Sequence, residues 1–307
     1  MSDRIRNFVC MALATAAAMI AMEAKSQDAE PRQYSNTPVG LNFLIAGYLY
    51  SQGKLAFDPS LAIVDAKFES HTGAVAYVRS FELFGQSAKF DVVAPYSTFS
   101  AHGSVADAAH EREMSGFGDP RFRVSMNLFG APALPLKDFA TYKQDLLVGV
   151  SLQVSAPLGQ YDDNKLLNLG ANRWSFRPEF GISKAWGPWT FEVAPSVTFF
   201  TNNPDFFNGS RLAQAPLYHV RGAIIRNLDS GAWVSLDGVY LKGMRTTLNG
   251  VPGDNEQENV RAGFTVAVPI DRQNSIKFNA STGVYSRTGT GFSLVGLAWQ
   301  YRWGEGY

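Results

Sequence analysis

The sequence has little cysteine, little charge and no long hydrophobic run. Its only cysteine is Cys10, so the remaining chain has no disulfide framework. Charged residues make up 18% of the 307 residues, below the ~25% that is usual for soluble domains. The 27 basic and 27 acidic side chains cancel, which gives no indication of a polyanionic partner. After residue 26 there is no apolar stretch of about 18 residues, which excludes a helical membrane span there.

The start of the chain has the pattern of a secretory signal peptide. Arg4 and Arg6 precede the apolar run from Phe8 to Met22, and the small residues Ala24 and Ser26 follow. The run is shorter than the ~20 residues that a spanning helix needs, which argues against the alternative of an N-terminal anchor helix. We therefore expect a signal peptide at 1–26, a short N-terminal extension at 27–37 and one domain at 38–307.

The rest of the chain alternates apolar and polar side chains with a period of two, which is typical of β-strands. In Leu146–Val154 every second residue is leucine or valine, with Gly149, Ser151 and Gln153 among the residues between them. An aromatic content of 13% also favours strands. The pattern predicts twelve strands, near residues 41–50, 68–82, 88–101, 118–129, 145–157, 174–186, 188–200, 217–228, 232–242, 259–270, 275–286 and 292–303.

The connections between these strands alternate in length. Segment 130–144 is the exception, because it is long where a short turn is expected, and it could fold inward or stay periplasmic. An even number of strands, with short turns at one end and long loops at the other, is typical of outer-membrane β-barrels. The short turns are 83–87, 187–188, 228–231 and 271–274, and the long loops are 51–67, 102–117, 158–173, 201–216 and 243–258.

A soluble β-sandwich also alternates apolar and polar residues, so the content of the two faces decides between the folds. Here the polar face is small and carries paired charges, and the apolar face often ends in an aromatic residue, as interfacial girdles do. These residues are Trp174, Trp186, Trp189, Phe199, Trp299 and Trp303. We therefore predict an all-β fold, a single antiparallel transmembrane β-barrel of about 12 strands, exported by its signal peptide to a bacterial outer membrane.

Several motifs occur in the order found in a known bacterial family. The most specific is PLGQYDDNKLLNLGANRW at 157–174, and it is accompanied by GFGDPR at 116–121, GAPAL at 130–134, LAQAP at 212–216 and RAGFTVAVPIDRQNSIKF at 261–278. Over residues 38–303 the chain resembles the family named for the MetA pathway of phenol degradation. The resemblance implies an outer-membrane β-barrel proposed to pass hydrophobic or aromatic compounds, and it carries over no catalytic or ligand residue. Gly243 and Met244 depart from the two glycines common there.

Charges of both signs fall on the polar face of the predicted strands. A charge that faced lipid near the membrane midplane would cost ~2–4 kcal/mol, so these residues are expected to face the lumen. Arg177 and Glu179 are expected to lie near Glu192 across the turn at 187–188. The charges could form a polar pathway for a small solute, or a structural network that fills the interior. The predicted lumen residues are Lys89, Asp91, Arg121, Arg123, Arg177, Glu179, Glu192, His219, Arg221, Asp237, Arg261, Lys277 and Arg302.

The sequence lacks the signature of a membrane-embedded hydrolase or of a metal enzyme. Of its four histidines, only His219 sits well within a predicted strand, and no serine–histidine motif surrounds it. The stretch HEREM at 110–114 lacks the second histidine of the zinc motif. We therefore predict no enzymatic activity, no cofactor and no metal site.

The chain closes on an aromatic stripe within LVGLAWQYRWGEGY. Gly296, Trp299, Tyr301 and Trp303 resemble the C-terminal strand signal that is read by the barrel-assembly machinery. The three aromatic side chains are expected to face lipid, with Arg302 facing the lumen and Trp303 at the periplasmic interface.

The predicted function is the passage of small, hydrophobic or aromatic molecules through, or out of, a mixed-charge lumen. Alternatives are a closed barrel with a structural or surface-interaction role, and a membrane-embedded lipid hydrolase. The expected partners are outer-membrane lipid and lipopolysaccharide, the barrel-assembly machinery and an unidentified small solute, with no nucleic acid. The sequence leaves open whether the lumen is plugged.

The closing stripe generates a test of where the last strand ends. We expect Trp303→Ser to lower the amount of assembled barrel in outer-membrane fractions more than Tyr307→Ser does, because Trp303 completes the alternating aromatic series and the residues GEGY follow it. The folded fraction is measured by heat-modifiable mobility on gels. The reverse ranking would put the end of the strand at Tyr307.

Overall fold

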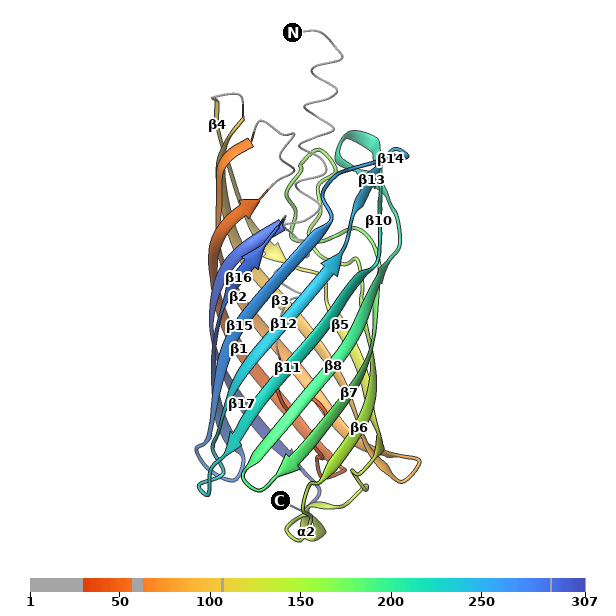
Figure 1. The fold of residues 1–307 in the computed structure, drawn as a ribbon, viewed down its shortest axis with the longest axis vertical. Helices are drawn as coiled ribbons and strands as arrows, with labels where there is room; N and C mark the ends of the chain where they lie inside the picture. Colours follow the sequence, from red (N-terminus) through yellow and green to blue (C-terminus); the bar gives the residue numbers. More distant parts are fainter. Residues whose placement is uncertain (1–29, 57–62, 106–107, 288, 307) are drawn as a thin grey trace.

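The described chain forms a closed barrel of tilted strands (Figure 1). The computed structural model describes residues 30–56, 63–105, 108–287 and 289–306, and the expected signal peptide lies outside the described residues. The sheet closes because β1 pairs with β2 on one side and with β17 on the other. The wall strands are β1 (Leu41–Ala56), β2 (Ile63–Leu83), β3 (Gln86–Val105), β4 (Ala108–Phe117), β5 (Arg121–Phe129), β6 (Leu146–Ser155), β7 (Ser175–Trp186), β8 (Trp189–Phe200), β11 (Leu217–Asn227), β12 (Trp233–Gly243), β15 (Gln257–Pro269), β16 (Asn274–Ser286) and β17 (Gly289–Gly304).

Two of these strands share one position in the wall. β3 pairs with β4 along its C-terminal half and with β5 along its N-terminal half. β4 and β5 therefore form a single wall strand that is interrupted at residues 118–120. Within the described ranges the wall therefore has twelve strands, all antiparallel to their neighbours. The prediction of an all-β barrel with about 12 strands is confirmed.

The prediction of loops throughout 51–67 and 102–117 is wrong. β1 to β4 run on into these segments, and Lys54 still pairs with Lys67 in the ladder. The sequence pattern gives no indication that the strands continue, because the apolar series stops in these segments. Above the apolar layer of a membrane the outward positions of a strand carry polar residues, although the backbone pairing continues.

The loops 201–216 and 243–258 contain a second, smaller sheet at the extracellular end, which we assign as the end with the long connections (Figure 1). Phe206, Leu212 and Leu248 are buried together in this sheet, so the loops have a hydrophobic cluster of their own. The elements are β9 (Asn203–Phe206), the short 3₁₀ helix η1 (Phe207–Gly209), β10 (Ser210–Gln214), β13 (Thr246–Leu248) and β14 (Val251–Pro252).

Segment 130–144 lies at the periplasmic end, where it contains the short helix α2 (Leu136–Phe139) (Figure 1). Its backbone pairs with the first short turn, because the Ser87 N–H donates to the Ala131 carbonyl at 2.9 Å. The Val39 N–H donates to the Leu134 carbonyl, also at 2.9 Å. The segment therefore folds against the barrel rim. No helix among the described residues combines the length and the apolar character that crossing a membrane requires.

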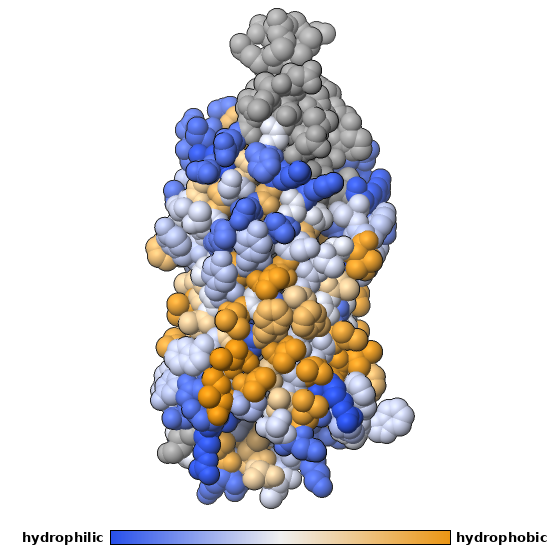
Figure 2. Space-filling view, turned by 90° about the vertical axis from the view of Figure 1, so that its left-hand side faces the viewer, coloured by the Kyte–Doolittle hydropathy of each residue, from blue (hydrophilic) through white to orange (hydrophobic). Residues whose placement is uncertain are grey.

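The outward face of the wall is apolar at mid-height. Figure 2 shows a hydrophobic band across one side of the molecule, with hydrophilic side chains above and below it. The strand residues Val193, Leu236 and Leu297 are 43%, 68% and 54% exposed, a degree of exposure that fits contact with lipid. The predicted girdle residues Trp174, Trp186, Trp189, Phe199 and Trp299 are all exposed on this face.

The break between β4 and β5 anchors the loop 158–173. The Asp119 carboxylate accepts hydrogen bonds from the backbone N–H of Gly159 at 2.9 Å and of Ala171 at 2.8 Å. A Cβ atom on Gly159 would lie 2.7 Å from the Asp119 backbone nitrogen, so only glycine fits this close approach. The GFGDPR and PLGQYDD…NLGANRW motifs therefore pack against each other and fix this loop to the wall.

This anchor predicts the effect of Asp119→Ala. Each of the two backbone N–H groups would lose its partner, at a cost of ~1–3 kcal/mol apiece. We expect trypsin to cleave at the exposed Lys165 several-fold faster in this variant. Asp163→Ala is the matched control, because the Asp163 carboxylate accepts only a hydrogen bond from its neighbour Asn164 among the bonds described. Equal cleavage rates for both variants would contradict the anchoring role.

Candidate functional site: the barrel lumen

The inward positions of the wall carry charge pairs in the periplasmic half of the barrel. Arg123 on β5 donates to Asp91 on β3 at 2.9 Å. Arg221 on β11 donates to Glu179 on β7 at 3.0 Å, and both of these side chains are at least 90% buried. The strands place these groups inside because their neighbours in sequence alternate outward into lipid. Such pairs are strongly coupled, since removal of one partner leaves the other buried and unpaired.

The N-terminal segment 30–37 occupies this part of the lumen. The Arg221 guanidinium donates to the backbone carbonyl of Glu30 and, at 3.2 Å, to the Gln33 side chain. The Lys89 ammonium donates to the Gln33 carbonyl at 2.6 Å. The Glu30 carboxylate pairs with Arg123 at 3.0 Å. The chain's own N-terminal segment therefore lies inside the lumen, and the wall charges hold it in place.

The Tyr34 ring packs directly against two glycines of the wall, which together form its seat. Gly149 and Gly181 are direct partners on β6 and β7. A Cβ atom at these positions would lie 2.3 Å and 2.0 Å from the Tyr34 ring, so glycine is required at both. The Tyr34 hydroxyl donates to Glu179 at 3.0 Å, beside Arg221. The ring and the charge pair thus form one connected unit.

Two further groups tie the segment to the wall. The backbone N–H of Arg32 donates to Glu192 at 2.7 Å, and the Arg32 guanidinium lies 5.5 Å from the Trp233 ring centre.

The Arg123 guanidinium holds the pKa of the Glu30 carboxyl well below its usual range, while burial acts in the opposite direction. Burial raises the pKa of the Tyr34 hydroxyl, so this group remains a hydrogen-bond donor.

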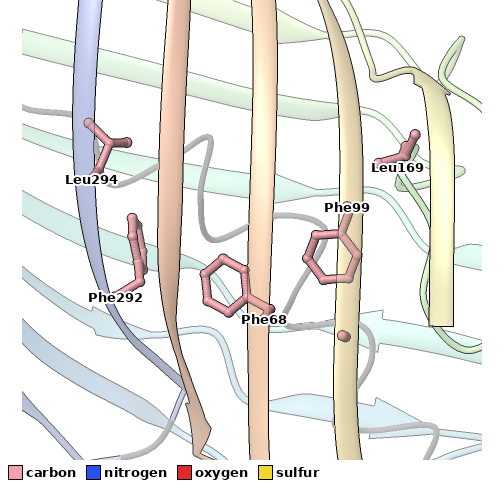
Figure 3. Packing of buried hydrophobic residues seen from close by; sticks show 6 residues of the cluster. Phe68, Phe99, Leu169, Phe292 and Leu294 are labelled. Atoms are coloured by element: carbon pink, nitrogen blue, oxygen red, sulfur yellow. The ribbon is translucent and has the colours of Figure 1, made fainter. Parts of the chain in front are cut away.

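The extracellular half of the lumen is aromatic. Phe68, Phe99 and Phe292 point inward from β2, β3 and β17, and their rings are 5.8 Å (Phe68 to Phe99) and 6.0 Å (Phe68 to Phe292) apart (Figure 3). Leu169 of the anchored loop is buried in the same cluster, and Leu167 packs against it. This cluster, with Ala101 and Leu294, is called the outer apolar zone below.

A cation borders the outer apolar zone. The Arg261 guanidinium lies 3.7 Å from the centre of the Phe292 ring and donates to the Phe292 carbonyl at 2.9 Å. It also donates to the Ser281 hydroxyl at 2.7 Å. The buried guanidinium thus stacks on an aromatic face of the outer apolar zone.

The remaining predicted lumen residues have separate positions. Arg177 donates to Gln153 at 3.0 Å, the buried His219 ring contacts Thr198 at 3.2 Å, and Asp237 accepts bonds from Ser235 and Thr265. Arg121 is on β5 and Lys277 on β16. Arg302 donates to the Arg272 carbonyl in the last short turn, which places it at the periplasmic rim.

The expected proximity of Glu192 to Arg177 and Glu179 is wrong. The turn pairs Trp186 with Trp189, so Glu192 lies opposite Ser183 and accepts its hydroxyl at 3.0 Å. Glu179 lies opposite Ser196 and turns toward Arg221 instead. The turn length fixes this register, and it offsets Glu192 from Glu179 by four positions along the ladder.

Sequence reasoning missed the residues of segment 30–37 and the glycine pair that seats Tyr34. One signal was present, because Gly149 and Gly181 both fall on inward positions of adjacent predicted strands. Glycines at such paired positions indicate close approach of another group. The length of the extension gave no indication of where it would lie.

The aromatic residues of the closing stripe lie on the last strand, β17. The rings of Trp299 and Tyr301 stack at 6.2 Å, and those of Tyr301 and Trp303 at 5.6 Å, so the three form a continuous outward column. The Trp299 indole N–H donates to Asn274 at 3.0 Å in the neighbouring strand. Gly296 lies between Asn279 and Leu49, where a Cβ atom would be 2.5 Å from the Asn279 side chain. Their role as an assembly signal stays a prediction.

No group of three or more histidine, cysteine or acidic side chains in the described chain is arranged to hold a metal ion. Several charged lumen groups, Lys89, Arg123 and Arg221 among them, bond to segment 30–37.

The closed wall, the apolar band and the inward charges define the molecule as an outer-membrane β-barrel. Residues 53–301 match the family described as "Putative MetA-pathway of phenol degradation", and the chain belongs to that family. The expected resemblance is therefore confirmed.

Two solved structures show the same kind of fold. The COG4313 outer membrane channel from Pseudomonas putida F1 is similar with a TM-score of 0.76 and 18% identity, covering 90% of this chain and 100% of that chain. The beta domain of the Bordetella autotransporter BrkA is similar with a TM-score of 0.54 and 9% identity, covering 86% of this chain and 100% of that chain. A comparison of the sequence with curated proteins finds no match.

The lumen network predicts the consequence of removing Arg221. In Arg221→Met, Glu179 loses a buried cation and the Glu30 carbonyl loses its donor, so the segment should leave its seat more often. A Gln33→Cys thiol, in a Cys10→Ser background, should then react with a water-soluble maleimide at least about tenfold faster.

Asp237→Asn is the control for this labelling experiment. It alters a buried lumen charge whose described bonds go only to Ser235 and Thr265, and none of these bonds reaches segment 30–37. Labelling that rises equally in both variants would mean that a general loosening of the barrel, and not loss of the plug contacts, exposes residue 33.

Proposed function

We propose that this barrel passes small hydrophobic or aromatic molecules across the bacterial outer membrane. The observation that carries the proposal is the outer apolar zone, since an aromatic lining inside a lumen suits apolar solutes better than sugars or ions. Family membership and the likeness to a structure described as an outer membrane channel support passage of a solute. Arg261 beside Phe292 favours aromatic solutes among apolar ones.

We propose that segment 30–37 closes the path in the resting protein. A solute that has passed the outer apolar zone meets Tyr34, Gln33 and the charges that hold them. Passage then requires the segment to shift, which means that bonds such as Arg221 to Gln33 must break transiently. Charges of both signs in this region give no preference for an ion of one sign.

A closed barrel with a structural role is the second candidate, and the position of segment 30–37 inside the lumen is the observation in its favour. Planar-bilayer conductance separates the two. If segment 30–37 is a movable plug, a variant that lacks residues 30–36 conducts at least several-fold more than the complete protein does. A deletion variant that assembles and remains silent would favour the structural role.

The transport proposal predicts a solute-specific loss on changing the outer apolar zone. Cells that produce the protein should take up radiolabelled toluene faster than cells without it, and Phe68→Ser with Phe292→Ser should remove most of that gain. A polar hydroxyl in place of each ring weakens the apolar contact by ~1.5–3 kcal/mol per side chain. The readout is the initial uptake rate in intact cells.

The control pair for this uptake experiment is Leu128→Ser with Phe129→Ser, which changes two exposed apolar residues outside the lumen lining. Each strain also receives labelled arabinose, whose uptake reports general leakiness. Toluene uptake that is the same with and without the protein would refute the transport proposal.

A further inference from the structure

The outward side of β1 to β4 continues above the aromatic girdle as a polar sheet face that the lumen does not use. The ladder arranges its described residues in four rows that cross the four strands. From the membrane outward, the rows are Tyr48, Gly73, Tyr96 and Phe117; then Tyr50, His71, Thr98 and Ser115; then Gln52, Glu69, Ser100 and Glu113; then Lys54, Lys67, His102 and Glu111.

The lowest row belongs to the girdle. Tyr48, Tyr96 and Phe117 are 49%, 47% and 64% exposed on the outward side, and the Tyr96 and Phe117 rings meet edge-on at 5.2 Å. Aromatic residues in this position mark the boundary between the acyl chains and the headgroups of the outer leaflet. The three rows above it therefore lie at the height of the headgroups, and Figure 2 shows hydrophilic side chains above the apolar band.

A hydrogen-bonded chain of three side chains stands at the centre of this face. The Tyr48 hydroxyl contacts the His71 Nδ1 atom at 2.5 Å, and the His71 Nε2 atom contacts the Glu69 carboxylate at 3.1 Å. The Tyr50 ring packs against the imidazole with its centre 5.0 Å away. These contacts hold the imidazole in one orientation, although about half of its surface and of the Glu69 surface stays exposed.

The top row brings two cations together. Lys54 and Lys67 are direct partners on β1 and β2, and both are exposed. Like charges directly opposite each other destabilise a sheet, so an anion that bridges them would relieve the repulsion. Glu111 and Glu113 lie on β4, at the other side of the face, and repel an anion from there. Glu69 lies one row below Lys67 and is engaged by His71, so the anion is expected at the Lys54–Lys67 pair in the top row.

We propose that this face binds the phosphorylated sugar headgroup of the outer-leaflet glycolipid. A phosphate lies between the Lys54 and Lys67 ammonium groups, and sugar hydroxyls meet the hydroxyl and amide groups of Tyr50, Gln52 and Thr98. The oriented His71 imidazole contributes a further polar contact. The aromatic row below meets the top of the acyl chains, so one lipid spans all four rows.

The arrangement fits a lipid better than a free anion or a protein partner. The aromatic row would be of no use to a free phosphate ion. The hydroxyl and amide rows match the many hydroxyl groups of a sugar, each of which needs a donor or an acceptor. The continuity of the four rows with the girdle is therefore the feature that selects the glycolipid.

The test uses the complete detergent-solubilised barrel and native mass spectrometry. Diphosphoryl lipid A, monophosphoryl lipid A and inorganic phosphate are the probes. We expect Lys54→Gln with Lys67→Gln to weaken the binding of diphosphoryl lipid A about thirtyfold at low salt, since each lysine near an anionic lipid contributes to binding. The unmodified barrel should prefer the diphosphoryl over the monophosphoryl form, and this preference should disappear in the double variant.

Lys184→Gln with Lys242→Gln is the matched control, because it removes the same two charges from exposed strand positions elsewhere. Lys184 pairs with Asp145 near the periplasmic end, and Lys242 pairs with Glu258. Heat-modifiable mobility confirms that each variant is folded, and His71→Phe provides a milder change at the centre of the face. Equal lipid A binding by both double variants would overturn the proposal. Phosphate that binds and competes as well as the lipid would also overturn it, since the site would then recognise a free anion.

Discussion

Closure of the wall between β1 and β17 is the constraint on which the rest of the structure depends. In a bilayer every backbone polar group must be paired within the protein, so the first and last strands have to meet along their full length. A closed wall of about eight strands is already just wide enough for its own side chains to fill. A wall of twelve encloses more space, and segment 30–37 fills part of it. Segment 30–37 is fixed to the wall immediately before β1 begins. There the Ser87 hydroxyl donates to the Thr37 carbonyl at 2.9 Å, and the Ser80 hydroxyl donates to the Pro38 carbonyl at 2.6 Å.

The inward charges of the wall and segment 30–37 form one network of ion pairs and hydrogen bonds. Arg123 meets two carboxylates, Asp91 from the wall and Glu30 from the segment. Arg221 likewise meets Glu179 from the wall and Gln33 from the segment. Removal of the segment would leave each guanidinium with fewer acceptors, so the network favours the plugged state. Arg123 and Arg221, two of the residues that the sequence predicts to face the lumen, therefore bind segment 30–37.

The sequence predicts the wall well because a strand reports its two faces locally. The alternation in Leu146–Val154 separates lipid from lumen without knowledge of any partner strand. Segment 30–37 has no such periodicity, and its contacts reach distant positions, as from Tyr34 to Gly149 and Gly181. The same limit applies to Glu192, whose partner depends on the register of one turn. Sequence patterns thus predict which face a residue occupies, whereas the pairs within the lumen require the closed barrel.

Under the proposed function, the two halves of the lumen have separate roles, one in selecting the solute and one in controlling its passage. The outer apolar zone lies nearest the extracellular end and is covered by Leu167 and Leu169 of a loop that Asp119 fixes to the wall. Rings there can hold an apolar solute, but they do not touch the bonds that keep Tyr34 in its seat. In the proposed transport, affinity for the solute and the frequency with which the path opens would therefore depend on different residues. Substitutions in the outer apolar zone would then change the preferred solute and leave the contacts of segment 30–37 intact.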